Sequence, residues 1–331
     1  MTEGHILIES FESQVLKENP LKDPYSRKLV IYLPPDYAHS NRKYPVLFLL
    51  SGFTGKGVMM LNREAFSEAI DEKLNRLMAS KQIKPMIVVM PDCFTYYGGS
   101  QYLDSEAVGQ YETYLTQELV PYIKNKFRVE MDRKAWAIAG KSSGGYGALV
   151  LAMRHPEIFG IAACHSGDMG FEYCYQPDFP QALIELEKNG GITEFMKKFY
   201  ALKKKDSRHF LTLNIIAMAA AYSPNPHNKP PFIDLPFNLK TGEIQPAVWE
   251  KWLAWDPVRM ISHYSEQLKL VKLFMDCGIK DEFRLYAGSR MLAERLKKLG
   301  IPYTYEEFED THMKISYRYD RSLQFISDNF Y

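Results

Sequence analysis

The sequence predicts an α/β fold in which a mostly parallel central sheet is flanked by helices. From residue 46 to residue 164, short apolar strand patterns alternate with longer helical patterns. Such alternation is typical of parallel strands joined by crossover helices. In addition, one strand-to-helix turn, residues 140–144, carries glycines on both sides of a serine. That spacing, G-x-S-x-G, is typical of the turn that presents a nucleophilic serine at the top of a parallel sheet.

The composition is that of a globular protein and excludes several classes of function. The chain has 331 residues, of which 46% are hydrophobic and 24% charged, and its net charge is +1. Because basic and acidic residues are interleaved, we expect no nucleic-acid binding and no attraction to anionic membranes. No apolar run reaches about 18 residues, so no membrane span is expected.

Location and cysteine chemistry follow from two further features of the sequence. The first residues, Met1 to His5, lack a basic segment followed by an apolar one, so no secretory signal is expected. The cysteines are scattered, without the spacing of a metal site or a disulfide framework. We therefore predict a cytoplasmic protein with free, buried thiols at Cys93, Cys164, Cys174 and Cys277.

The N-terminal region predicts two strands that differ from the rest of the sheet. Residues 5–16 and 26–33 carry β-branched and apolar residues in partial alternation, which favours antiparallel strands near a sheet edge. Pro34 and Pro35 end the second strand. The runs that follow are continuously apolar, as buried parallel strands are. From there the expected order is strand, helix, strand, helix, strand, helix, strand over residues 46–50, 61–79, 86–90, 103–126, 135–139, 146–155 and 159–164.

The alternation stops after residue 164, and the next clear strand is residues 270–275. This interval is too long for an ordinary crossover. We interpret residues 170–262 as a cap insertion, helical and irregular, within a single domain of residues 1–331. An apolar helix in it, from Phe210 to Tyr222, is too short to span a membrane and is expected to pack on the core or on a second subunit. In the second case the protein would be a homodimer. The remaining elements are helices at 180–189, 192–204, 207–221, 282–299 and 313–328 and a strand at 301–308.

The glycine spacing selects Ser142 as the candidate nucleophile. Gly140 and Gly144 stand two residues before and after it, where side chains would clash as strand and helix pass closely. Ser143 lacks this spacing, because Lys141 stands two residues before it. The alternative interpretation is a glycine-rich helix start with no chemistry.

A serine hydroxyl needs a base, and the base needs an orienting acid. In this architecture the chain order is serine, acid, histidine, and the groups follow strand ends. His312 lies just after the last predicted strand and is the candidate base. Asp281 follows the preceding strand and is the candidate acid. The competing acids are Asp276, Glu282 and Asp168.

Acyl transfer also needs N–H groups directed at the developing oxyanion. One is expected from Ser143, directly after the nucleophile. The other is expected from the glycine-containing loop after residues 46–50, where Phe53 is the first choice and Gly52 its alternative. The alternative interpretation is an ordinary strand-to-helix turn.

These motifs together resemble the Putative esterase branch of the α/β-hydrolases. That branch includes S-formylglutathione hydrolases (esterase D), enterochelin-type siderophore esterases, feruloyl esterases and mycolyltransferases. The resemblance spans residues 28–160 and 265–320 and implies an α/β-hydrolase fold with Ser142, Asp281 and His312 as catalytic triad. Gly55 stands where S-formylglutathione hydrolases have cysteine. The resemblance rests on residues 50–55, Pro91-Asp92, Gly98-Gly99-Ser100, residues 118–123, Gly144-Gly145, residues 277–281 and Thr311-His312.

The expected function is therefore a serine carboxylic-ester hydrolase that acts on small-molecule esters, short-chain or aryl, and needs no metal or organic cofactor. The alternatives are an acyltransferase with the same triad and an alcohol or sugar acceptor, and a non-catalytic binding protein on the same fold. Aromatic side chains suit an aryl ester, although they more often fill a core. The candidate pocket aromatics are Tyr96, Tyr97, Trp249, Trp252 and Trp255.

Overall fold

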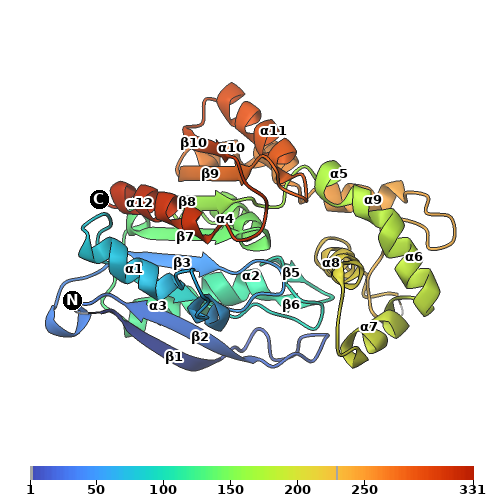
Figure 1. The fold of residues 1–331 in the computed structure, drawn as a ribbon, viewed down its shortest axis with the longest axis horizontal. Coiled ribbons are helices and arrows are strands. Elements are labelled where there is room, and N and C mark those ends of the chain that lie inside the picture. The colour runs from blue at the N-terminus through green and yellow to red at the C-terminus, as the bar shows by residue number, and fades with distance from the viewer. Residues whose placement is uncertain (1–2, 229) are drawn as a thin grey trace.

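The structure, a computed structural model, describes residues 3–228 and 230–331. These residues form an eight-stranded sheet in the order β1-β2-β4-β3-β7-β8-β9-β10, together with a separate pair, β5-β6 (Figure 1). From β4 to β10 the neighbouring strands are parallel, whereas β1 and β2 are antiparallel and lie at one edge. The predicted α/β fold with a mostly parallel sheet is confirmed.

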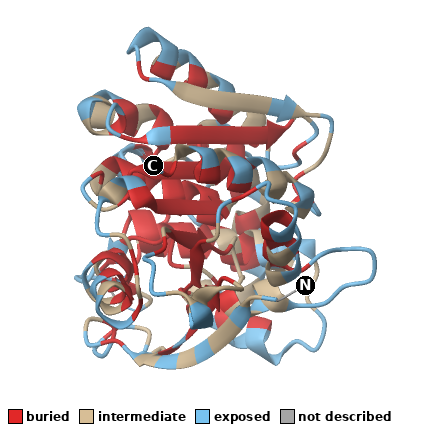
Figure 2. Cartoon of the chain, turned by 90° about the vertical axis from the view of Figure 1, so that its left-hand side faces the viewer, coloured by how far each residue is buried: buried red, intermediate tan, exposed pale blue. Residues whose placement is uncertain are grey.

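The central strands are short and buried. Every residue of β3 and β4 is buried, because both faces of the sheet are covered. Figure 2 shows this buried centre, with intermediate and exposed residues on the outer strands and helices. The strands are β1 (His5–Glu12), β2 (Ser26–Leu33), β3 (Val46–Leu50), β4 (Ile87–Met90), β5 (Asp104–Ser105), β6 (Gly109–Gln110), β7 (Trp136–Lys141), β8 (Ile161–His165), β9 (Lys272–Gly278) and β10 (Tyr303–Phe308).

Helices cover the sheet on both faces. One face packs against α1 (Ile70–Ala79) and α12 (Tyr319–Asn329). The other packs against α3 (Val120–Lys126), α4 (Ser143–Arg154) and further helices on the same side, α10 (Pro257–Leu268) and α11 (Leu285–Lys298). The four cysteines are free and buried within these layers, as predicted.

Four helices start later than the sequence predicts. The differences are small for α11, which begins at residue 285 instead of 282, and α12, which begins at 319 instead of 313, and larger for two others. The helix expected over 61–79 begins at residue 70, where the Glu72 carboxylate accepts a hydrogen bond from the Ala69 N–H at 2.9 Å. The helix expected over 103–126 begins only at residue 111, with α2 (Tyr111–Thr113). The residues before it contain the short strands β5 and β6, and Gly109 takes a left-handed φ of 132°. It continues through a π-helical turn, Tyr114–Leu119, into α3. We attribute the turn to Pro121, which lacks an N–H and whose ring displaces the carbonyl one turn earlier.

The segment between β8 and β9 forms a helical layer beside the sheet (Figure 1). We call this segment the cap. The helices predicted at 180–189, 192–204 and 207–221 are present within a few residues of the expected bounds. Three further helices, α5 (Phe171–Cys174), α9 (Pro246–Leu253) and α10, were not predicted, and α10 packs against α4 and α11 of the core. Besides α10, the helices of the layer are α5 (Phe171–Cys174), α6 (Phe179–Asn189), α7 (Ile192–Ala201), α8 (Ser207–Tyr222) and α9 (Pro246–Leu253).

The apolar helix α8 lies inside this layer. From Thr212 to Tyr222 nearly all of its residues are buried, against α6, α7, α9 and β5 of the same chain. The apolar sequence of this helix is therefore explained within one chain, and a homodimer stays a prediction. Among the described residues, no helix has the combination of length and apolar character needed to cross a membrane.

Candidate active site

Ser142 occupies a strained turn between β7 and α4. Its φ of 57° and ψ of −129° are rarely adopted by residues other than glycine. Two main-chain hydrogen bonds hold it there: its N–H donates to the His165 carbonyl, and its carbonyl accepts from the Tyr146 N–H, both at 2.9 Å. Strain that the surrounding structure maintains is typical of a nucleophile on a strand-to-helix turn.

The two flanking glycines are required by close backbone contacts. A Cβ atom at Gly140 would lie 2.5 Å from the carbonyl of Gly144. A Cβ atom at Gly144 would lie 2.4 Å from the carbonyl oxygen of Leu50 on β3. Neither contact is possible between real atoms, so the G-x-S-x-G spacing follows from the packing of α4 against β7 and β3.

His312 and Asp281 form a buried pair. Nδ1 of His312 lies 2.7 Å from Oδ2 of Asp281, and the exposed fractions of the two side chains are 4% and 0%. The other Asp281 oxygen accepts the N–H of Phe283 at 2.9 Å, and the Phe283 ring packs edge-on against the imidazole. Because Nδ1 faces the carboxylate, Nε2 is the nitrogen left for another partner.

The three competing acids have other partners. Asp276 binds the ring of His165 at 2.7 Å instead of the ring of His312. Glu282 accepts the main-chain N–H of His312 at 2.8 Å, and so positions the residue without contacting its ring. Among the described residues, the only carboxylate bonded to the His312 imidazole is that of Asp281.

The third competitor, Asp168, lines the same cavity as Ser142 and is bonded to the residue that follows Ser142. Its Oδ2 accepts hydrogen bonds from the Ser143 hydroxyl at 3.2 Å, the Tyr175 hydroxyl at 2.9 Å and the Gln101 amide at 3.1 Å. Burial raises the pKa of Asp168 above its usual value, against the lowering effect of these donors. Asp168 is thus a buried carboxyl group that is held by neutral donors.

The loop of residues 51–55 lies against the Ser142 turn. A Cβ atom at Gly52 would lie 3.3 Å from the Lys141 carbonyl oxygen. Tyr102 anchors this loop, because its hydroxyl donates to the Ser51 carbonyl at 2.5 Å. The N–H of Phe53 has no hydrogen-bond partner within residues 3–228 and 230–331. Ser143 is the first residue of α4. The first N–H groups of a helix have no acceptor within the helix, so the N–H of Ser143 makes no intrahelical hydrogen bond.

One cavity of about 590 Å³ joins these groups. Its volume lies within the range of small-molecule sites. The sequence-predicted residues Ser142, His312, Ser143, Phe53 and Gly52 all line it. Asp281 stands behind His312. The apolar part of the lining is Phe53, Met59, Met60, Cys174, Tyr175, Phe210, Leu211, Phe283, Leu285, Met313 and Tyr319.

The five aromatic residues expected in the pocket do not line this cavity. Tyr96 stacks on Tyr200 of α7 with ring centroids 4.6 Å apart, and so joins the cap to the core. Tyr97 is buried in the core beside it. Both side chains thus pack on other tyrosine rings and do not line the cavity.

The three tryptophans that were expected in the pocket also lie elsewhere. Trp249 and Trp252 pack on Phe179 within the cap, and the guanidinium of Arg154 lies over the ring of Trp255. Trp249 and Trp252 thus pack within the cap, Trp255 contacts α4 of the core, and none of the three lines the cavity.

Several cavity residues were not predicted from the sequence. Phe283 and Met313 stand two residues after Asp281 and one after His312, so nearness to the candidate acid and base was an available signal. Phe210 opens the apolar run of α8. For Met59 and Met60, in the short 3₁₀ helix Gly57–Leu61, the sequence carries no comparable signal.

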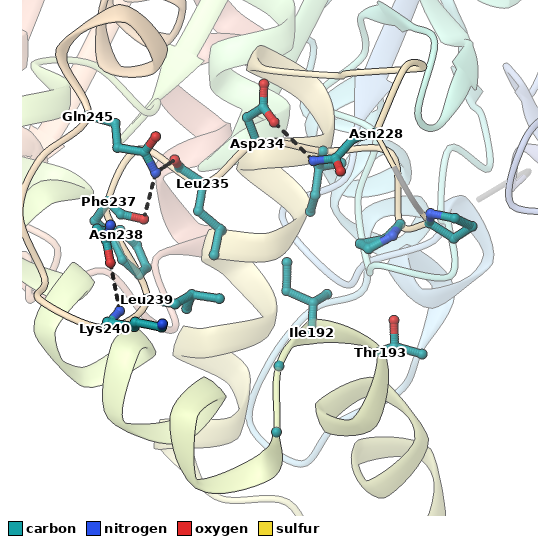
Figure 3. A pocket seen from close by; sticks show the side chains of 15 residues that line it. Ile192, Thr193, Asn228, Asp234, Leu235, Phe237, Asn238, Leu239, Lys240 and Gln245 are labelled. Carbon is teal, nitrogen blue, oxygen red and sulfur yellow. Dashed lines mark hydrogen bonds between the residues drawn. The ribbon is translucent and has the colours of Figure 1, made fainter.

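A second hollow, of about 700 Å³, lies within the cap (Figure 3). Several of its polar groups are bonded to one another: the amide of Gln245 donates to the Phe237 carbonyl at 3.2 Å, and Asn238 accepts the Lys240 N–H at 2.8 Å. None of the candidate catalytic residues lines it. We therefore place the candidate active site in the 590 Å³ cavity.

The fold and the site define a class of protein. A serine on a strained turn after a central parallel strand, with a histidine and an acid after later strands, is the arrangement of the α/β-hydrolases. Within this class, the chain belongs to the Putative esterase family, whose model matches residues 24–320.

Curated relatives match part of the chain. The esterase Rv1288 of Mycobacterium tuberculosis is 35% identical over 143 residues, which are 41% of this chain and 28% of that protein. An S-formylglutathione hydrolase of Paracoccus denitrificans is 31% identical over 134 residues, 38% of this chain and 47% of the relative. An endo-1,4-beta-xylanase/feruloyl esterase of Xylanibacter ruminicola is 31% identical over 146 residues, 41% and 19% of the two chains. The chain thus spans less than half the length of each of these relatives.

Solved structures match the whole chain at low identity. A ferulic acid esterase superimposes with a TM-score of 0.64 at 22% identity, over 100% of both chains. An S-formylglutathione hydrolase from Agrobacterium tumefaciens superimposes with a TM-score of 0.59 at 19% identity, over 100% of this chain and 97% of the other. These likenesses establish the α/β-hydrolase fold.

Proposed function

We propose that the protein is a serine carboxylic-ester hydrolase that works through an acyl-enzyme. The observation that carries this proposal is that His312, whose Nδ1 lies 2.7 Å from the buried Asp281 carboxylate, lines the same cavity as Ser142. Membership of the Putative esterase family supports it. A buried carboxylate that is hydrogen-bonded to Nδ1 keeps the imidazole in the tautomer whose Nε2 can accept a serine proton.

The proposed reaction has two steps. Ser142 Oγ attacks the ester carbonyl while His312 takes the serine proton. The N–H groups of Phe53 and Ser143, with Gly52 as the neighbouring donor, stabilise the oxyanion. His312 then protonates the leaving alcohol. In the second step His312 deprotonates a water molecule that attacks the acyl-enzyme, and it returns this proton to Ser142 Oγ as the acid product leaves. Asp281 stabilises the imidazolium in both steps.

The substrates that we propose are short-chain or aryl esters of small molecules. Two kinds of support exist: the cavity of about 590 Å³ is largely apolar, and relatives and structural neighbours include feruloyl esterases. The same acyl-enzyme would be released by an alcohol in an acyltransferase. Hydrolysis of p-nitrophenyl acetate with and without an added alcohol, with analysis of both products, separates the two reactions.

The test of the catalytic assignment is the Ser142→Ala variant. It should lower kcat for p-nitrophenyl acetate by about 10⁵–10⁶, as the loss of a triad serine does. A fluorophosphonate should label the wild type on the peptide that contains Ser142. The matched control is Ser100→Ala, which changes the serine of the Gly98-Gly99-Ser100 motif and should keep the label. Labelling of another serine would contradict the proposal.

A further inference from the structure

Four exposed apolar side chains form a rim on the candidate active site. Met59, Phe210, Phe283 and Met313 all line the cavity that contains Ser142, and their exposed fractions are 48%, 41%, 44% and 60%. They come from four separate segments: the 3₁₀ helix at 57–61, the first turn of α8, the loop before α11 and the loop after β10. We call these four residues the apolar rim. Grouped apolar area that faces water marks a surface that binds something.

The rim continues into the interior of the cavity. Leu285 and Leu211 line the same space, together with Met60 and Phe53. An apolar group that is attached at Ser142 therefore meets apolar side chains both inside the cavity and at its edge. The rim is thus an extension of the candidate substrate site, unlike the separate hollow within the cap.

Charged residues of the cavity are engaged by the protein itself. The Lys56 ammonium lies 4.4 Å from the centre of the Phe94 ring, and Asp178 pairs with Arg284 at 3.4 Å. Asp168 is held at the Ser142 turn by Ser143 and two further donors. Lys141 directly precedes Ser142, and burial lowers the pKa of its ammonium group. Lys56 and Asp178 thus have partners within the protein, whereas Asp168 and Lys141 lie at the Ser142 turn.

The residue types of the rim favour a flexible ligand. Met59 and Met313, and also Met60 in the lining of the cavity, have unbranched side chains that adapt to the shape of their partner. Flexible thioether side chains can keep contact with an alkyl chain in many conformations.

We propose that the apolar rim binds the distal part of an aliphatic acyl chain, so that medium-chain acyl esters are better substrates than acetyl esters. This inference rests on the proposed esterase function and extends it from short chains to longer ones. Each methylene that leaves water should raise kcat/KM by about fourfold until the chain passes the rim.

The experiment compares p-nitrophenyl acetate, butyrate, hexanoate and octanoate as substrates of the wild type and of two rim variants, Phe210→Ser and Met59→Ser. We expect kcat/KM to rise along the series in the wild type. Each variant should lower the ratio of kcat/KM for octanoate to that for acetate by about tenfold, because one large apolar contact is lost. A ratio measured on one sample is independent of the fraction of protein that is folded.

The matched control is Phe66→Ser, which removes a fully exposed phenylalanine that does not line the cavity. Its octanoate to acetate ratio should equal that of the wild type. Equal ratios in the rim variants, or a wild-type kcat/KM that falls steadily from acetate to octanoate, would overturn the inference. So would rim variants that lower methyl ferulate hydrolysis while leaving the aliphatic ratio unchanged. If Ser142→Ala kept its activity on acetate, the esterase proposal itself would fail, which is a different result.

Discussion

The carbonyl of His165 accepts the main-chain hydrogen bond of Ser142 at 2.9 Å, and so the end of β8 holds the strained turn. The imidazole of the same residue bonds to Asp276 at 2.7 Å, on the strand that leads to Asp281. Its other nitrogen lies 2.7 Å from the Ser322 hydroxyl on α12. His165 therefore connects the candidate nucleophile to the strand that precedes the candidate acid.

Ser322, His165 and Asp276 repeat the residue types of a triad, but they are buried and none lines the cavity. Arg318 adds a further bond to Asp276, at 2.8 Å. A buried polar network of this kind is costly when one member is lost, because the remaining groups stay buried without partners. We therefore interpret this cluster as a structural brace.

The first prediction concerns this brace. His165→Ala leaves Ser322 and one oxygen of Asp276 without their buried partner, and should lower the free energy of unfolding by about 3 kcal/mol. Urea unfolding monitored by circular dichroism measures the change. The control is His263→Ala, at an exposed position of α10, where a change within about 0.5 kcal/mol is expected. A loss of less than about 1 kcal/mol in His165→Ala would show that the cluster is not a brace.

The second prediction separates the two buried aspartates near the site. Asp281→Asn should lower kcat by about 10⁴, because an amide no longer fixes the tautomer of His312 or stabilises its charge. Asp276→Asn should mainly lower stability, since its partners are His165 and Arg318. Turnover of p-nitrophenyl acetate per folded molecule, with unfolding curves of both variants, provides the comparison. A folded Asp276→Asn protein that lost turnover as strongly as Asp281→Asn would contradict the assignment.

Local sequence patterns were sufficient to predict the structure of a segment where a single physical cause determines it. The continuous apolar runs at 46–50 and 86–90 gave buried parallel strands because both sheet faces are covered. The glycine spacing located the Ser142 turn because backbone contacts exclude any side chain at these glycines. Chain order and strand ends then placed Asp281 and His312 near each other, which the 2.7 Å contact shows.

The cap was less predictable, because its side chains have several possible partners. Trp252 and Tyr97 are aromatic like many ligand-binding residues, and only the fold shows that they pack against other rings or the core. The apolar rim residue Met59 is ordinary in sequence and becomes a cavity residue only when its loop meets α8 and the loop after β10. Contacts between segments far apart in the chain leave no recognisable pattern in the sequence around each residue.

The last prediction concerns pH and a pair outside the site. Burial alone would lower the pKa of His155, but the Glu112 carboxylate, 2.6 Å away, and Glu157 together raise it above its usual value. The folded state then binds the proton more tightly than the unfolded state, so this contribution to stability is complete below about pH 6.5 and is lost as pH rises through the raised pKa. His155→Gln should cost about 1 kcal/mol near pH 6 and clearly less near pH 9, in urea unfolding curves at both values. His263→Gln, at an exposed position, should show no such difference. An equal cost of His155→Gln at the two pH values would mean that its charge contributes nothing to folding.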